Sequence, residues 1–499
     1  MVSLYIAFGL YLIGMIFVGL AFSKKSSNLN EYLIGGRSIG SWVTAFSAQA
    51  SDMSGWLLMG LPGAIYLAGF GEVWTAIGLA IGTFLNWYFV APRLRVYTGK
   101  CKDLTLSSFF SNRFRDSSGF LRLFSAIVVL YFFTVYAASG MVASGKLFNT
   151  MYNIDYKLAV LIGACVILFY TMMGGYLAVC WTDLFQGALM FLALVIVPII
   201  SLMNMPNDLQ TILTKRELTL SFFPGGVSMK TIVPAVSCLV WGLGYFGQPH
   251  ILSRFMSVKN IKILPRTITI AMTWVIISLF AAVVIGVISI SFFVPVLGNG
   301  EEEKVFILLI QRLFPGWIAG FLLAAILAAI ISTIDSQLLV ATSILTSDFY
   351  YRFFRREAKN DELVKVSRFF VLLISIIAML LALFPSDTIF GIVKFAWGGF
   401  GAAFGPVVLM SLYSRKTSSI SAITGMVVGT IVMLAWYFTG LGKVMYEILP
   451  GFVANFLAIM IMNQIVPQKN EEILAEFDEV VAATREKRLL DSDTSSASQ

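Results

Sequence analysis

Runs of about 20 apolar residues recur from one end of the chain to the other. A helix of about 20 residues is about 30 Å long, which matches the thickness of the hydrocarbon core of a bilayer. About thirteen such runs can be counted by hydropathy, centred near residues 13, 55, 82, 134, 166, 192, 242, 280, 331, 375, 402, 429 and 456. The sequence therefore predicts an all-α polytopic membrane protein with about 13 transmembrane helices.

The composition agrees with this class and excludes others. The chain is 58% hydrophobic and 12% charged, whereas soluble domains are nearer a quarter charged. The net charge of +8 comes from basic residues in short loops between apolar runs, so we expect the lipid bilayer as partner and no nucleic acid. The single histidine, His250, and four cysteines without a CxxC pair favour neither a cofactor nor a catalytic triad, so we do not expect an enzyme.

The charges of the loops predict an orientation. The loops after the third, seventh, ninth and eleventh runs are basic, whereas an opposite loop carries the acidic run Glu301–Glu303. Because basic loops stay in the cytoplasm, we expect the N-terminus outside and the C-terminus in the cytoplasm of a plasma-membrane protein. The chain turns polar near Pro467, which divides a transmembrane domain, 1–466, from a cytoplasmic tail, 467–499.

Two of the apolar runs are interrupted. The second contains the polar stretch Ser51–Gly55, and the seventh contains three glycines and a proline between Trp241 and Pro249. A membrane helix is broken only where protein or a water-lined cavity satisfies the freed backbone groups. Paired broken helices are a typical sign of the central site of a transporter.

Asp52 lies near the middle of the second run, where an unpaired carboxylate costs at least a few kcal/mol. Such an acid either faces a cavity with a function or is paired with a buried arginine or backbone donor. The clustering of polar residues around Asp52 favours a functional site.

The ninth run carries a stripe of small and hydroxyl side chains at helical spacing, Ala329, Ser332, Thr333 and Ser336. Sodium is a hard cation that prefers oxygen ligands, which hydroxyls and freed carbonyls would supply. Hydroxyls that bond their own helix explain the spacing equally well.

Several further residues have two interpretations. Asp335 is either a gate carboxylate or the partner of a basic residue of an inner loop. Arg37 and Asp183 lie at predicted cytoplasmic helix ends, where they form a closing salt bridge or stay solvated. Gly398–Pro406 favours close helix packing.

Four segments together resemble the sodium:solute symporter family, and within it the members that carry proline: GGRS at 35–38, SAQASDMSGWLLMGLPGA at 47–64, WGLGYFGQPHIL at 241–252 and LAAIIST at 327–333. The resemblance runs over most of the chain. It implies a LeuT-like core of two inverted five-helix repeats, about 40–203 and 230–412. It also implies import of L-proline coupled to sodium by alternating access. We expect no obligate protein partner from the sequence.

The resemblance also implies roles for single residues. Sodium would be held by the carbonyls of Ala50 and Met53 together with Ala329, Ser332 and Thr333. Sodium and substrate coupling would involve Asp52, Ser54 and Gly55, and proline would contact Trp241, Tyr245 and Pro249. Arg37 and Asp183 match positions on the cytoplasmic cation path. Two alternatives stay open: a sodium- or proton-coupled carrier of another small solute, and a solute sensor without coupled flux.

Overall fold

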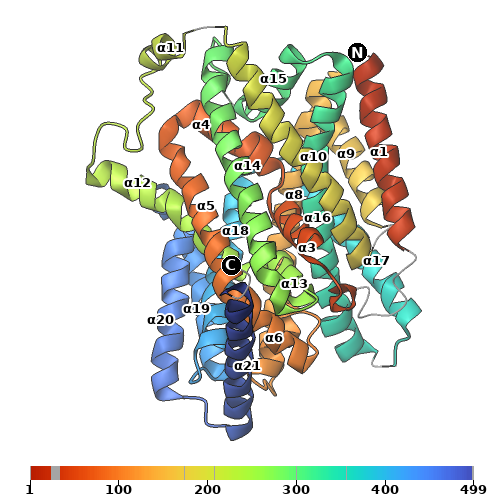
Figure 1. The fold of residues 1–499 in the computed structure, drawn as a ribbon, viewed down its shortest axis with the longest axis vertical. Coiled ribbons are helices and arrows are strands. Elements are labelled where there is room, and N and C mark those ends of the chain that lie inside the picture. The colour runs from red at the N-terminus through yellow and green to blue at the C-terminus, as the bar shows by residue number, and fades with distance from the viewer. Residues whose placement is uncertain are drawn as a thin grey trace.

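The structure, a computed structural model, describes residues 2–23, 34–172, 175–206, 208–298, 300–355 and 357–496. Within these ranges the regular structure is helical, apart from one isolated bridge between Ile39 and Val258. The long helices stand side by side along the long axis of the molecule (Figure 1). Their bounds are α1 (Val2–Ser23), α8 (Phe120–Tyr152), α9 (Tyr156–Thr171), α10 (Tyr176–Met203), α14 (Leu264–Phe292), α16 (Gly316–Ser343), α17 (Asn360–Ala382), α18 (Ile389–Tyr413), α19 (Ser419–Phe438) and α20 (Ile448–Ile465).

The predicted class, an all-α polytopic membrane protein, is confirmed. In the described ranges, ten helical segments are long and apolar enough to cross a membrane. Three shorter apolar helices, Val2–Met15, Trp56–Ala68 and Tyr156–Thr171, fall at further predicted runs. Because these three are shorter than a full span, the count of about thirteen stays a prediction.

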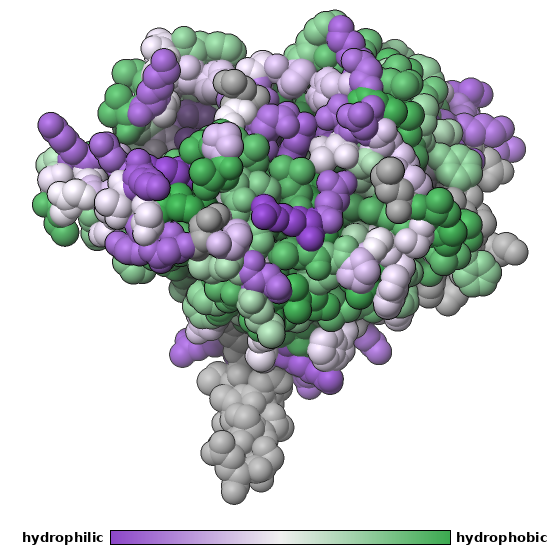
Figure 2. All heavy atoms as spheres, turned by 90° about the horizontal axis from the view of Figure 1, so that it is seen from above, coloured by the Kyte–Doolittle hydropathy of each residue, from purple (hydrophilic) through white to green (hydrophobic). Residues whose placement is uncertain are grey.

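The two ends of the molecule carry different elements. The N-terminus and α11 (Leu209–Lys215) lie at one end, here called the N-terminal face, whereas α6 (Ala91–Cys101) and α21 (Glu471–Ser496) reach toward the other, the C-terminal face (Figure 1). Figure 2 looks onto the N-terminal face and shows hydrophilic residues, in purple, lying among hydrophobic ones.

The polar tail forms helix α21, which packs on α6 at the C-terminal face. Phe477 and Val480 of α21 are buried, and the Arg113 guanidinium lies 5.0 Å from the centroid of the Phe477 ring. Three surface ion pairs join the tail to the membrane domain: Lys100–Glu479, Arg115–Glu472 and Arg415–Asp478.

Both breaks predicted from the sequence are confirmed. The first separates α3 (Ser41–Asp52) from η2 (Trp56–Gly60) and α4 (Leu61–Ala68), and Met53 leaves the helix with φ −87° and ψ 85°. The carbonyl of Asp52 at the end of α3 accepts hydrogen bonds from Trp56 Nε1 at 3.0 Å and from the Tyr136 hydroxyl at 3.2 Å. Side chains thus satisfy the backbone that the break exposes, as a membrane interior requires.

The second break connects three short elements, α12 (Met229–Leu239), η5 (Val240–Gly247) and α13 (Pro249–Ser257). Side chains again take up its carbonyls: Asn86 Nδ2 donates to Tyr245 O at 2.9 Å, and Trp397 Nε1 donates to Trp241 O at 2.9 Å. Pro249 begins α13, where its missing N–H costs no helical hydrogen bond.

Glycines let other helices approach η5 closely. Helix α5 (Val73–Leu85) brings Gly78 and Gly82 against its backbone, where a Cβ atom would overlap a carbonyl of the neighbouring chain segment. From α18, a Cβ on Gly401 would lie 2.9 Å from Gly244 Cα. The close-packing interpretation of Gly398–Pro406 is therefore confirmed.

Candidate functional site

A side-chain hydrogen bond joins the two broken helices at their breaks. Tyr245 of η5 donates its hydroxyl to Asp52 Oδ2 at the end of α3 over 2.6 Å, and both residues are buried. Asp52 Oδ1 is also buried and has no hydrogen-bond partner in the described part of the chain. One oxygen of this carboxylate accepts a hydrogen bond and the other is free among the described residues. The free oxygen can coordinate a cation or accept a hydrogen bond from an ammonium group.

Helix α16 crosses α3 beside this break and contributes the hydroxyl stripe. Ser332 Oγ and Thr333 Oγ1 both donate to the carbonyl of Ala50, at 2.8 and 3.2 Å. Ser332 Oγ also lies 3.2 Å from Ala329 O, and all four residues are buried. The stripe thus reaches across to another helix, and buried oxygens from two helices gather at one place, which is the chemistry that a hard monovalent cation prefers.

The remaining residues of the first break follow Ala50 closely in the chain. Met53 and Ser54 form the non-helical turn, and Met53 lies three residues after Ala50. The backbone N–H of Trp56 lies 3.5 Å from Ser54 Oγ. A Cβ on Gly55 would lie 2.8 Å from the Ala143 Cβ, so a glycine is needed where α8 presses on the turn.

The second break supplies aromatic side chains. The Trp241 ring lies 4.7 Å from Phe390 and 6.4 Å from Trp56 between ring centroids. Trp241 also lines a cavity of about 400 Å³ whose other walls include Glu72, Glu302 and Lys394. Trp241 therefore lines a cavity of mixed polarity and shares η5 with Tyr245, and Pro249 follows at the start of α13.

A buried ion pair lies one helical turn further toward the C-terminal face. Arg254 Nη2 and Asp183 Oδ2 are 3.3 Å apart, and both side chains are fully buried. Ser47 donates to Asp183 at 2.6 Å, and Arg254 donates to Ser336 Oγ at 2.5 Å. The cluster thus ties α10 and α13 to α3 and α16, the two helices that form the oxygen cluster.

The interpretation that pairs Arg37 with Asp183 is wrong. Arg37 donates to the backbone carbonyls of Thr98 and Asp103, at 2.8 and 2.7 Å, because it lies beside α6, away from the buried Asp183. Burial raises the pKa of the Asp103 carboxyl to about 7, against the opposing effects of its hydrogen bond from Asn112 and of nearby Arg37.

Sequence reasoning missed Arg254, which it counted among the charges of an inner loop. The structure buries it inside α13, five residues after Pro249 in a mostly apolar stretch, and that apolar setting was the available signal. Asp335 is buried beside this cluster, with Oδ1 3.5 Å from Ser336 Oγ. Its expected ion pair with an inner-loop base is not formed among the described residues, since Arg254 pairs with Asp183.

Paired broken helices around a buried acid, inside a bundle of membrane-crossing helices, define a secondary transporter. The chain belongs to the sodium:solute symporter family, which matches residues 32–429. The family resemblance of the sequence is therefore confirmed.

Relatives in several bacteria are similar to this chain over nearly its whole length. The osmoregulated proline transporter OpuE of Bacillus subtilis is 44% identical, over 93% of this chain and 95% of its own. The sodium/proline symporters of Haemophilus influenzae and Escherichia coli are 44% and 43% identical, and cover 97% and 92% of this chain and 98% and 92% of their own.

Two solved structures share the fold. A sodium-coupled sialic acid symporter in a substrate-bound outward-open state matches with a TM-score of 0.78 at 22% identity, covering 94% of this chain and 99% of its own. Mhp1, a nucleobase-cation-symport-1 family transporter in a closed conformation, matches with a TM-score of 0.54 at 13% identity, covering 90% and 98%. The predicted LeuT-like class of fold is confirmed.

Proposed function

We propose that this protein imports L-proline together with sodium, down the sodium electrochemical gradient, by alternating access. Relatives named as sodium/proline symporters, at 41–44% identity, support this substrate pair. The observation that carries the mechanism is the Tyr245–Asp52 hydrogen bond, which joins the proposed solute residues directly to the helix that contributes to the oxygen cluster.

Sodium is held by the carbonyls of Ala50 and Met53 together with Ala329, Ser332 and Thr333. The hydrogen bonds between α16 and Ala50 support this set, because they bring two hydroxyls and a carbonyl from separate helices within reach of one small ion. Uncharged oxygens bind a monovalent cation less tightly than a ring of carboxylates would, which suits an ion that must be released.

The proline zwitterion binds at the second break. Its carboxylate is oriented by free N–H groups of a half-helix, where the helix dipole favours an anion. Its ring packs on Trp241 and Tyr245, and Pro249 shapes the start of α13 beneath it. Asp52, Ser54 and Gly55 connect this pocket to Ala50 and Met53, the two sodium ligands at the first break.

Coupling follows from the shared helix. An ion that draws α16 toward α3 preorganises the turn at Asp52, and bound proline in turn favours the ion, since coupling between two sites is reciprocal. One charge moving down 100 mV supplies about 2.3 kcal/mol, and a tenfold sodium gradient adds about 1.4 kcal/mol. One sodium ion can then support roughly a 500-fold accumulation of proline.

The protein lies in the plasma membrane with its N-terminal face outside and its C-terminal face in the cytoplasm. The basic residues Lys100, Arg115 and Arg415 at the C-terminal face and the acidic Glu301–Glu303 run support this orientation. Residues of about 40–203 and 230–412 form the two repeats. Asp183, now with Arg254 as its partner, belongs to the cytoplasmic cation path, and Arg37 lies at its mouth.

Uptake of labelled proline into proteoliposomes tests the proposal. An inward sodium gradient should drive accumulation, and replacement of sodium by choline at fixed pH should abolish it. Uptake that persists in choline and follows a proton gradient would favour the alternative in which the uncommitted Asp52 oxygen titrates. Binding of proline without flux would favour a sensor. Accumulation of a different solute instead of proline would show that proline is not the substrate.

A further inference from the structure

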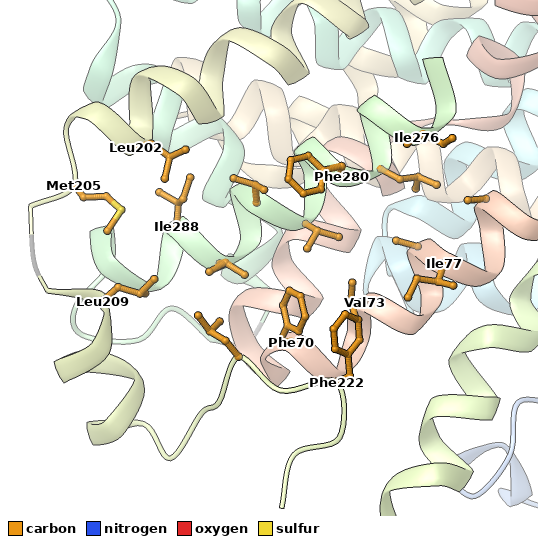
Figure 3. Close-up of a pocket in the computed structure, with 17 residues that line it drawn as sticks. Phe70, Val73, Ile77, Leu202, Met205, Leu209, Phe222, Ile276, Phe280 and Ile288 are labelled. Carbon is orange, nitrogen blue, oxygen red and sulfur yellow. The ribbon is translucent and has the colours of Figure 1, made fainter. Parts of the chain in front are cut away.

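An apolar groove lies between α5 and α14 on the side of the molecule. None of the residues assigned to the sodium and proline sites lines it. Its volume is about 610 Å³. Every side chain that lines it is apolar, and Figure 3 shows them facing one another from the two helices and from the connection after α10. Buried Leu279 and Val283 form its floor, whereas Ile276 and Phe280 on its rim are largely exposed.

The position of the groove along α14 shows which part of the bilayer it faces. The lining residues of α14 run from Ile276 to Ile288, which is about 18 Å of helix. They occupy the half of α14 nearer the N-terminal face, and half of a bilayer core is about 15 Å thick. The groove therefore extends through one leaflet, from the middle of the membrane to its surface.

Water is a poor occupant of this groove. A buried water needs two to four polar partners, and the lining offers only hydrocarbon and the thioether of Met205. Both α5 and α14 belong to membrane-crossing segments, so the exposed rim faces lipid. A flexible hydrocarbon chain that enters from the side matches the groove in length and in chemistry.

The segment between α10 and α12, which contains α11, lies at the N-terminal face (Figure 1) and borders the groove with Leu209, Leu220 and Phe222. Trp74 holds this segment in place, because its indole N–H donates to Phe222 O at 2.9 Å, and the Phe222 ring packs 5.2 Å from Phe70. Tryptophan side chains gather at the level of lipid headgroups, so Trp74 marks where a headgroup would stop.

We propose that this groove binds one acyl chain of a membrane lipid as a resident part of the protein. With the orientation proposed above, the lipid belongs to the outer leaflet. The chain would press on the stripe Val73, Ala76, Ile77 and Ala80 of α5. The opposite face of α5 carries Gly78 and Gly82 against η5, so the lipid supports the broken helix from behind.

Photo-cross-linking tests the proposal directly. The full-length protein is reconstituted with phosphatidylglycerol that carries a diazirine near the end of one acyl chain, and labelled peptides are mapped after irradiation. Label per residue should be several-fold higher on 70–80 and 276–288 than on 158–169 of α9, where Leu158, Leu161 and Ile162 are exposed and do not line this groove. Equal labelling of the three segments would overturn the proposal.

Two variants that fill the groove sharpen the test. Ala80→Phe and Val284→Phe each place a ring in the groove and should lower the label there at least fivefold, whereas the matched control Ile162→Phe should leave it unchanged. Undiminished labelling in both filled variants would contradict a groove site. The unaltered protein could instead show no label in the groove and form cross-links between two copies through α14. That result would assign the groove to a second copy of the chain and overturn the proposal of a bound lipid.

Discussion

The hydroxyl of Tyr245 and the Oδ2 atom of Asp52 lie 2.6 Å apart, although 193 residues separate them in the chain. Each belongs to a different broken helix, and each sits at or beside its break. A movement of either half-helix therefore changes the geometry of the other. One short hydrogen bond thus connects the proposed solute pocket to the proposed ion site.

Tyr245→Phe removes the donor and keeps the ring. The Asp52 carboxylate then loses its side-chain partner, which costs about 1–3 kcal/mol for a buried group. We expect the proline concentration for half-maximal uptake to rise about tenfold or more, and sodium to lower that concentration less than in the unaltered protein, because the bond joins the two sites. Initial rates in proteoliposomes measure both. Tyr131→Phe, at an exposed position on α8, is the control. A change in the half-maximal concentration of sodium alone would show that Tyr245 does not belong to the solute pocket.

Ser332→Ala and Thr333→Ala each remove one hydroxyl from the oxygen cluster. We expect the sodium concentration for half-maximal uptake to rise about tenfold, which corresponds to about 1.4 kcal/mol, while proline affinity at saturating sodium changes little. Thr342→Ala is a matched control, because Thr342 on the same helix donates only to carbonyls of its own helix, Leu338 and Leu339. Equal effects on sodium and proline would argue against a cation site.

Arg254→Leu leaves Asp183 buried without its cation. The loss of one partner of a buried pair costs about 3–5 kcal/mol, so we expect a large fall in the melting temperature in detergent. The double variant Arg254→Leu with Asp183→Leu should recover part of it, since no charge then remains unpaired. Arg115→Leu, which breaks a surface pair with Glu472, should cost less than about 1 kcal/mol. A double variant less stable than both singles would contradict the pairing.

The raised pKa of Asp103, at the C-terminal face, predicts that the stability of the folded protein depends on pH. Its pKa of about 7 lies above the ordinary value of 3.8, so the folded protein holds a proton that the unfolded chain releases between these values. This contribution to stability is complete below about pH 4 and is lost as the pH rises toward 7. Asp103→Asn keeps an acceptor for Asn112 and removes the titration. The free energy of unfolding of the variant, compared with that of the unaltered protein, should therefore be more favourable at pH 8 than at pH 5. The same difference at pH 5 and at pH 8 would refute the assignment.

Much of the fold was predictable because the bilayer restricts it strongly. Length and hydropathy identify membrane helices, and Gly and Pro within an apolar run indicate where a helix breaks, as at Gly242–Gly247 and Pro249. The hydroxyl stripe was predictable as a stripe, but spacing could not decide whether Ser332 bonds its own helix or α3. That choice depends on how the two helices cross.

Charged residues were the hardest to assign. A lysine or arginine near a helix end has the same sequence signature whether it meets water or a buried acid. Arg254 is buried because Asp183, 71 positions earlier, comes to lie beside it, and no local pattern records that contact. Arg37 was paired wrongly for the same reason, since its acceptors are backbone carbonyls that every residue carries. Asp335 lacks its predicted ion pair among the described residues, and its alternative role as a gate carboxylate stays a prediction.

The tail helix α21 has a consequence for biogenesis. Its ion pairs join residues 379, 357 and 63 positions apart, so it can dock only after the whole membrane domain has left the ribosome and been inserted. Until then Ile473, Phe477 and Val480, which are buried in the docked state, form an uncovered apolar strip on α21. Chaperones and proteases recognise such strips. Docking of α21 therefore distinguishes a completely assembled chain from an unfinished one.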